Sequence, residues 1–182
     1  MFPFQPKSLT GALVLGSFAG YAILAWNSAL SSYGASGALL GKDFADAAVS
    51  AVIWQFLHAN FFHFLGNAFF LLYFGSNVER RMGDGRYAWL FFVESAVSTA
   101  ALAAFALGPT VGMSGFTMAV LAYSAVRMRE TRHPDAKGAF FFLFLNVAIG
   151  LFGNVSLVAH LAGAVSGIAF RVAERILTKR RS

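Results

Sequence analysis

Long apolar runs and short polar segments alternate along the chain. The apolar runs cover residues 9–30, 61–78, 87–107, 114–127, 139–153 and 155–173. A helix that crosses the hydrocarbon core of a bilayer needs about 20 mostly apolar residues, and a soluble core needs no runs of this length. The pattern therefore predicts an all-α, polytopic membrane protein with six transmembrane helices. These spans leave no room for a separate soluble domain, so we expect residues 1–182 to form one transmembrane domain.

Composition agrees with a membrane-embedded chain. Hydrophobic residues make up 58% of the sequence and charged residues 12%, which is about half the charged share of an average soluble domain. The net charge of +6 could suggest a nucleic-acid partner, but the basic residues lie in short segments between the apolar runs. Basic residues collect in the cytoplasmic loops of membrane proteins, so these positions report topology.

The basic residues fall almost entirely on one side of the expected membrane. If the N-terminus is cytoplasmic, the cytoplasmic segments hold Lys7, Arg80, Arg81, Arg86, Arg127, Arg129, Arg132, Lys137, Arg171, Arg175, Lys179, Arg180 and Arg181. Only Lys42 lies on the other side. We therefore expect both termini in the cytoplasm, and a lipid bilayer rather than nucleic acid as the partner. Residues 9–30 exceed a typical signal-peptide core, so a retained helix is expected. A minimal chain without a targeting peptide is expected in a prokaryotic plasma membrane.

The sequence contains no cysteine, which excludes disulfides, thiolate nucleophiles and cysteine-ligated metal sites. His58 and His63 are five residues apart, about 140° around a helix, and no carboxylate lies near them in sequence, which disfavours a shared metal ion. His63 and Asn67 are four residues apart and should share one helix face. We expect a polar pair there, with no metal and no cofactor.

The fourth apolar run follows the stretch "GPTVGMSGFTM", residues 108–118. From Ser114 to Arg127 there are about 14 residues, or roughly 21 Å of helix, against a hydrocarbon core of about 30 Å. If the basic end sits at the cytoplasmic surface, the residues before Ser114 must enter the membrane. Irregular backbone at that depth needs protein or a water-filled cavity around it. Gly108 and Gly112 give the loop conformational freedom. Ser114 should then lie at the bottom of a hydrated pocket, unless it is only a helix N-cap.

Two stripes of small residues predict a close contact between helices. The first lies in "AHLAGAVSG" and the second in the fourth run, and together they comprise Ala159, Gly163, Gly167, Gly115, Ala119 and Ala122. Packing the stripes together would bring His160 to Ser114 as a base beside a nucleophile. Free N–H groups at the start of the fourth helix, with His63 and Asn67, could then stabilise an oxyanion. Alternatively, Asn67 and His160 serve only as hydrogen bonds between helices.

With these residues in place, the chain resembles the rhomboid family of intramembrane serine proteases. The resemblance rests on the stretches "HANFFHFLGN", "FGSNVERRMG", "GMSG" and "AHLAGAVSG", in this order on six spans. It implies that Ser114 is the nucleophile and that His160 is its general base and later acid, without a third acidic member. It also implies an oxyanion hole formed by His63, Asn67 and the backbone N–H of Ser114.

The resemblance further implies which residues shape the site and what the substrate is. Its structural positions are Gly112, Gly115, Gly163, Gly167, Glu79 and His58. Met118 stands where many relatives have an aromatic residue, and Trp54 lacks the arginine that often accompanies it. The implied substrates are transmembrane segments whose helix is weak near the cleavage site, with small residues at the cut.

Glu94 has no counterpart in this resemblance. A charged carboxylate is costly inside a bilayer, so we expect a protonated side chain that is hydrogen-bonded to a neighbouring helix, with substrate handling as the alternative. The leading function is an intramembrane serine endopeptidase that uses no metal or organic cofactor. One alternative is a catalytically inactive rhomboid-like protein that binds membrane proteins, although such relatives usually lose the serine or the histidine. Another is a transporter or metal carrier that uses the intramembrane histidines.

Overall fold

The computed structural model describes residues 7–35, 43–106, 108–152 and 156–179, and these residues are mostly helical. In chain order the elements are α1 (Leu9–Trp26), η1 (Ser28–Tyr33), α2 (Phe44–Ile53), α3 (Phe61–Phe70), η3 (Leu71–Gly75), α4 (Ser76–Met82), α5 (Asp84–Phe105), α6 (Ser114–Glu130), α7 (Ala136–Ile149), η4 (Gly150–Phe152) and α8 (Leu157–Lys179). Of these, η3 is a π-helical turn and the other two η elements are 3₁₀ turns. Within the described ranges, the only β pairing is an isolated bridge between Ala35 and Thr110. The predicted all-α fold class is confirmed.

Every apolar run of the sequence contains helix, but the ends differ from those expected. Helix α1 stops at Trp26 and a 3₁₀ turn follows it, whereas the first run was expected to be helical to residue 30. The second run continues through α3, η3 and α4 to Met82. Helix α7 starts at Ala136, before the expected start at residue 139. Helix α8 ends at Lys179, beyond the expected end at residue 173. The expected ends at 107 and 153–155, together with Lys42, Arg180 and Arg181, lie outside the described residues.

Three helices in the described part of the chain are long and apolar enough to cross a membrane by length and composition, namely Leu9–Trp26, Asp84–Phe105 and Leu157–Thr178. Helix α7 is apolar but shorter. The π turn divides the second run into short elements, and α6 carries Arg127 and Arg129 in its last turn. The protein is thus a polytopic helical membrane protein, while the count of six spans stays a prediction.

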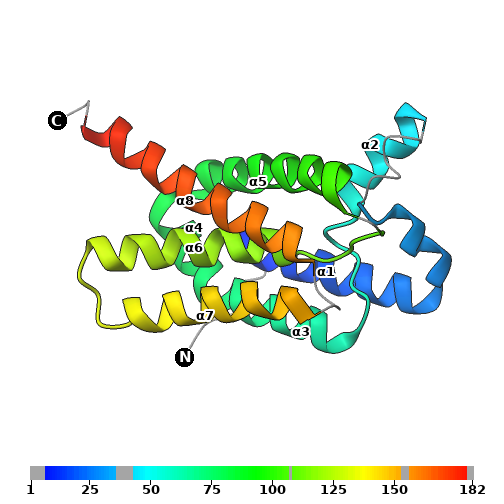
Figure 1. Ribbon diagram of the computed structural model, residues 1–182, viewed down its shortest axis with the longest axis horizontal. Coiled ribbons are helices and arrows are strands. Elements are labelled where there is room, and N and C mark those ends of the chain that lie inside the picture. The colour runs from blue at the N-terminus through cyan, green and yellow to red at the C-terminus, as the bar shows by residue number, and fades with distance from the viewer. Residues whose placement is uncertain (1–6, 36–42, 107, 153–155, 180–182) are drawn as a thin grey trace.

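Helix α2 was not expected from the sequence. It has ten residues, begins at the N-cap Asp43, whose side chain accepts from the Asp46 N–H, and leaves Val52 64% exposed. Figure 1 shows α2 at one end of the bundle, beside the segment that follows α1. A helix this short gives only a weak periodic signal, and none of the apolar runs covers it.

Helix α6 occupies the centre of the bundle. Every residue from Ser114 to Ala125 is buried, and Figure 1 shows the other long helices around it. A helix that is apolar on all sides is expected in such a position. The predicted short central fourth helix is therefore confirmed, although it ends at Glu130, three residues later than the expected end at residue 127. The surrounding helices expose large apolar side chains instead, among them Phe62 at 81% and Phe144 at 69%, as lipid-facing surfaces do.

Glycines on α8 allow it to lie directly against α6. A Cβ atom built on Gly163 would collide with the carbonyl group of Gly115, and one built on Gly167 would collide with that of Ala119. Both contacts advance by four residues on each helix, so the two helices run parallel, with their N-terminal ends together. This is the contact that the two stripes of small residues predict.

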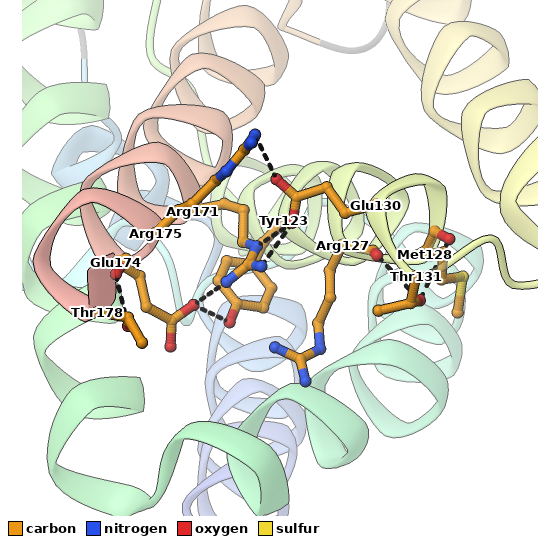
Figure 2. A network of polar contacts seen from close by, with 9 residues as sticks. All are labelled: Tyr123, Arg127, Met128, Glu130, Thr131, Arg171, Glu174, Arg175 and Thr178. Atoms are coloured by element: carbon orange, nitrogen blue, oxygen red, sulfur yellow. Dashed lines mark hydrogen bonds and ion pairs between the residues drawn. The ribbon is translucent and has the colours of Figure 1, made fainter. Parts of the chain in front are cut away.

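Charged side chains gather at the other end of this helix pair, where α6 finishes. Arg171 on α8 bonds to Glu130 on α6 and, at 2.7 Å, to Glu174 on its own helix. The Tyr123 hydroxyl donates to Glu174 at 2.6 Å, and Arg175 lies 3.5 Å from Glu130 (Figure 2). The side chains of Arg171 and Glu174 are partly buried and paired with each other, whereas Glu130 and Arg175 lie at the exposed edge of this cluster.

Candidate functional site

The loop before α6 is fixed to the protein by its backbone. The N–H groups of Ala35 and Thr110 each donate to the other residue's carbonyl at 2.9 Å, and the Gly112 N–H donates to the Trp54 carbonyl at 2.9 Å. Gly112 and Met113 are buried, whereas Gly108 is exposed. The loop's polar groups are thus satisfied by protein where it enters the bundle, as irregular backbone in a membrane demands.

Trp54 and Gln55 hold the other side of this loop. The Trp54 indole N–H donates to Thr99 on α5 at 2.9 Å, and the Gln55 amide donates to Ser95 one turn away on the same helix. Both side chains are buried. The segment without the family's usual arginine is therefore attached to α5 by two side-chain hydrogen bonds.

Ser114 is the first residue of α6 and is 5% exposed. Met113 occupies the N-cap position, and no side-chain hydrogen bond caps this helix end. The alternative reading of Ser114 as the N-cap is therefore wrong. The first N–H groups of a helix have no acceptor within it, so those of the first turn are available beside the Ser114 hydroxyl.

His160 lies on α8 where that helix packs against the start of α6. The carbonyl oxygen of the preceding residue, Ala159, lies 3.4 Å from where a Cβ of Gly115 would be. The Nδ1 atom of His160 lies 2.8 Å from the Asn146 carbonyl. A carbonyl only accepts, so Nδ1 carries the proton and Nε2 keeps its lone pair. That Nε2 atom is buried and has no hydrogen-bond partner in the described parts of the chain.

His63 lies against the Gly112 loop. Gly112 has a φ of 121°, and a Cβ there would come within 2.5 Å of the His63 Cε1 atom. The Nε2 atom of His63 is likewise buried without a partner among the described residues. The His63 ring thus lies against the loop that leads into Ser114, and the unpaired nitrogen of His160 lies on the helix that packs against the start of α6.

His58 connects Asn67 to the same loop. Its Nδ1 lies 3.0 Å from the Phe56 carbonyl, so Nε2 is the acceptor, and it receives the Asn67 amide at 3.1 Å and the Met113 N–H at 3.4 Å. The sequence predicted a structural role for His58, but it did not predict these hydrogen bonds to Asn67 and Met113. Asn60 could have indicated that His58 lies outside the helix. Asparagine is a common N-cap residue, and here it caps α3, which begins at Phe61, so that His58 lies before the helix.

The angular argument about the two histidines is therefore wrong. His58 does not lie on the helix with His63, and their ring centroids are 5.2 Å apart in an edge-on contact. Both nitrogens of His58 are nevertheless engaged by protein groups. In the described residues no group of three or more His, Cys, Asp or Glu side chains is placed to hold a metal ion.

Glu94 lies on α5, and its carboxylate is close to Gly115, the residue after Ser114. Its side chain is fully buried, and a Cβ on Gly115 would come within 2.5 Å of its Oε1 atom. We expected a hydrogen bond to a neighbouring helix. That prediction is wrong for Oε1, because this oxygen accepts a hydrogen bond from Ser98 on the same helix. The Oε2 atom is buried and unpaired within the described chain. Met118, one turn after Ser114, is also buried, with 1% exposed.

Comparison with known proteins gives a consistent picture. A family model described as Rhomboid domain matches residues 45–175. Rhomboid protease GlpG of Haemophilus influenzae is 29% identical over 140 residues, which cover 70% of this chain and 72% of that protein. Rhomboid protease GlpG of Salmonella choleraesuis is 26% identical over 152 residues, or 75% of this chain. The match spans 54% of the Salmonella protein, so this chain covers about half of that relative's length.

Proposed function

Because the chain belongs to the rhomboid family of intramembrane serine proteases, we propose that it cleaves transmembrane segments of other membrane proteins through Ser114 and His160. The observation that carries the proposal is the state of His160. Its Nδ1–H is held by a backbone carbonyl, and its unpaired Nε2 is buried where α8 packs against the start of α6. An imidazole held in this way is suited to accept a proton from a neighbouring hydroxyl.

In the proposed reaction, His160 Nε2 removes the Ser114 proton as the hydroxyl oxygen attacks the scissile carbonyl. The tetrahedral intermediate collapses when the imidazolium returns that proton to the leaving amine, which leaves an ester on Ser114. Water, deprotonated by the same Nε2, then hydrolyses the ester and restores the serine. Asn146 offers a neutral carbonyl to Nδ1 in place of a carboxylate, so it orients the ring without adding negative charge.

The oxyanion would be held by the Ser114 N–H, the His63 ring and the Asn67 amide. The N–H supports this assignment because it lies in the first turn of a helix. The buried, unpaired Nε2 of His63 supports it as a donor free for a ligand. Asn67 shares its amide with His58, so it can add one hydrogen bond while it keeps the loop tether.

The proposed substrate follows from the location of Ser114 and His160 in a membrane protein. Hydrolysis needs water and an extended peptide, and an intact lipid-facing helix supplies neither. Segments with weak helices and small residues at the cut are the proposed targets. We place the protein in a prokaryotic plasma membrane with both termini in the cytoplasm, so that Ser114 faces the opposite side.

The test is cleavage of a fluorescent transmembrane-segment substrate by the purified protein in liposomes. Ser114→Ala and His160→Ala are each expected to lower kcat/KM by at least about 1,000-fold, with thermal unfolding unchanged within a few degrees. A folded wild type that cleaves no segment of a helix-weak panel would instead support the inactive, membrane-protein-binding alternative. Activity that EDTA abolishes would support metal chemistry at the histidines.

A further inference from the structure

A polar pocket lies at the end of the bundle away from Ser114. It is a cavity of about 250 Å³ between η3–α4, the last turns of α6 and the turn that leads into α7. Its polar wall is formed by Asn77, Arg81, Ser124, Arg127, His133 and Asp135, and much of the rest is aromatic or aliphatic. The pocket therefore joins an apolar wall to cationic groups at the edge of the membrane-spanning region.

The two arginines of this pocket have no anionic partner in the described residues. Glu130 and Glu174 are instead bound by Arg171, Arg175 and Arg86. Figure 2 shows the Arg127 side chain pointing away from Glu130. Arg127 is still near enough to Glu174 for their charges to interact, but the two form no ion pair. Guanidinium groups from two different helices thus line one cavity, and neither forms an ion pair within the described residues.

Asp135 contributes a negative charge to the pocket wall and so determines how much anionic charge a ligand would need to balance the arginines. Its carboxylate lies 3.8 Å from the His133 ring, also in the pocket wall. With histidine counted as neutral, two guanidinium groups and one carboxylate leave a balance of +1. One singly charged anion would complete the pocket. The Ser124 side chain, which is largely buried, offers a hydroxyl donor beside the arginines.

We propose that this pocket binds the phosphodiester head group of an anionic phospholipid. Guanidinium groups bind phosphate oxygens through paired N–H donors, and basic pockets between transmembrane helices on the cytoplasmic side suit such head groups. Inorganic phosphate shares this chemistry, but it is partly dianionic at neutral pH and has no use for the apolar wall. The site is separate from the proposed dyad and does not depend on the protease activity.

The test is native mass spectrometry of the detergent-purified protein titrated with phosphatidylglycerol, with phosphatidylcholine as the neutral lipid. We expect one tightly held phosphatidylglycerol on the wild type. The double variant Arg81→Gln, Arg127→Gln should weaken it at least about tenfold, since each arginine near a lipid surface contributes on the order of 1 kcal/mol. The matched control, Arg129→Gln with Arg175→Gln, removes the same charge from the other cavity at this end and should bind as the wild type does.

Equal losses in both double variants would overturn the proposal, because they would indicate attraction to net charge alone. Equal binding of phosphatidylcholine would do the same. Displacement of the lipid by millimolar inorganic phosphate would reassign the pocket to free phosphate. If the double variant does not fold, Arg81→Gln alone serves, because its side chain lies on the exposed surface of α4. Its affinity should still fall severalfold, and unchanged binding would count against the site.

Discussion

Gly112 combines a backbone conformation and a close contact that both exclude a side chain. Its φ is 121°, and an added methyl group would meet the His63 ring. Gly112→Ala should therefore lower kcat at least about tenfold and destabilise the fold by about 1–3 kcal/mol. Substrate cleavage and thermal unfolding measure both effects. Gly108→Ala is the control, because nothing lies within 4 Å of its added Cβ. Similar losses in the two variants would refute the role of Gly112.

His63 offers a cleaner test of the oxyanion hole than Asn67. Its ring Nε2 bonds to no described residue, so His63→Ala removes no hydrogen bond of that nitrogen within the described part of the chain. We expect kcat to fall about 100-fold with KM within about twofold, because the contact forms only as charge develops. Asn67→Ala should also lower the thermal midpoint, since it removes a partner of His58. A rise in KM with unchanged kcat for His63→Ala would contradict its assignment.

Single residues were predicted from sequence with uneven success. Spacing alone indicated that the two stripes of small residues meet, because a four-residue period maps directly onto a helix face, and the structure pairs Gly163 with Gly115. Spacing failed for His58, since the helix begins after it. The expected partner of Glu94, which was argued from the cost of a charge in the bilayer, was also wrong for Oε1, because Ser98 four residues away donates to that oxygen. Such side-chain choices depend on local competition that a pattern does not record.

The contact between α6 and α8 joins the two helices that carry the proposed nucleophile and the proposed base. A Cβ on Gly163 would overlap the Gly115 carbonyl, so Gly163→Ala must push the helices apart. We expect a loss of about 1–3 kcal/mol in stability and a larger fractional loss of kcat than of binding. Gly138→Ala, on α7 with nothing near its added Cβ, controls for the substitution itself. Full activity of the Gly163 variant would show that the dyad does not rely on this contact.

Glu79 joins two elements that are far apart in the sequence. Its buried carboxylate accepts the N–H groups of Leu9 at 2.6 Å and Thr10 at 3.0 Å, in the first turn of α1. Glu79→Gln keeps the shape but removes the charge and one acceptor. It should therefore cost about 1–2 kcal/mol, as the loss of a helix cap does. Chemical or thermal unfolding should show this loss, while Asp84→Asn, an exposed acid at the start of α5, should change little.

Elements were easier to predict than their interruptions. Long apolar runs located every main helix, because a membrane imposes length and composition together. The π turn at Leu71–Gly75 lies inside an unbroken apolar run and leaves no mark in the hydrophobic pattern. Helix α2 is too short to give a clear period. The hydrogen bond between His58 and the Met113 N–H could not be predicted from the pattern either, because it joins segments 55 residues apart.

At the scale of the whole molecule, the two polar clusters lie at opposite ends of α6. Ser114 begins this helix, and the Arg171–Glu130 contacts lie at its other end (Figures 1 and 2). Between them the outer faces are rich in phenylalanine. One end is therefore suited to hydrolysis and the other to a charged membrane surface, which makes orientation in the bilayer a direct consequence of the fold.

That orientation can be measured because the chain contains no cysteine. Ser31→Cys would place a thiol in the exposed turn after α1, and Lys137→Cys would place one at the exposed start of α7, near the basic end. The distribution of basic residues predicts that a membrane-impermeant maleimide labels the first variant in intact cells and the second only after permeabilisation. The unsubstituted chain supplies a zero background. The reverse labelling pattern would place both termini outside, and Ser114 would then open toward the cytoplasm.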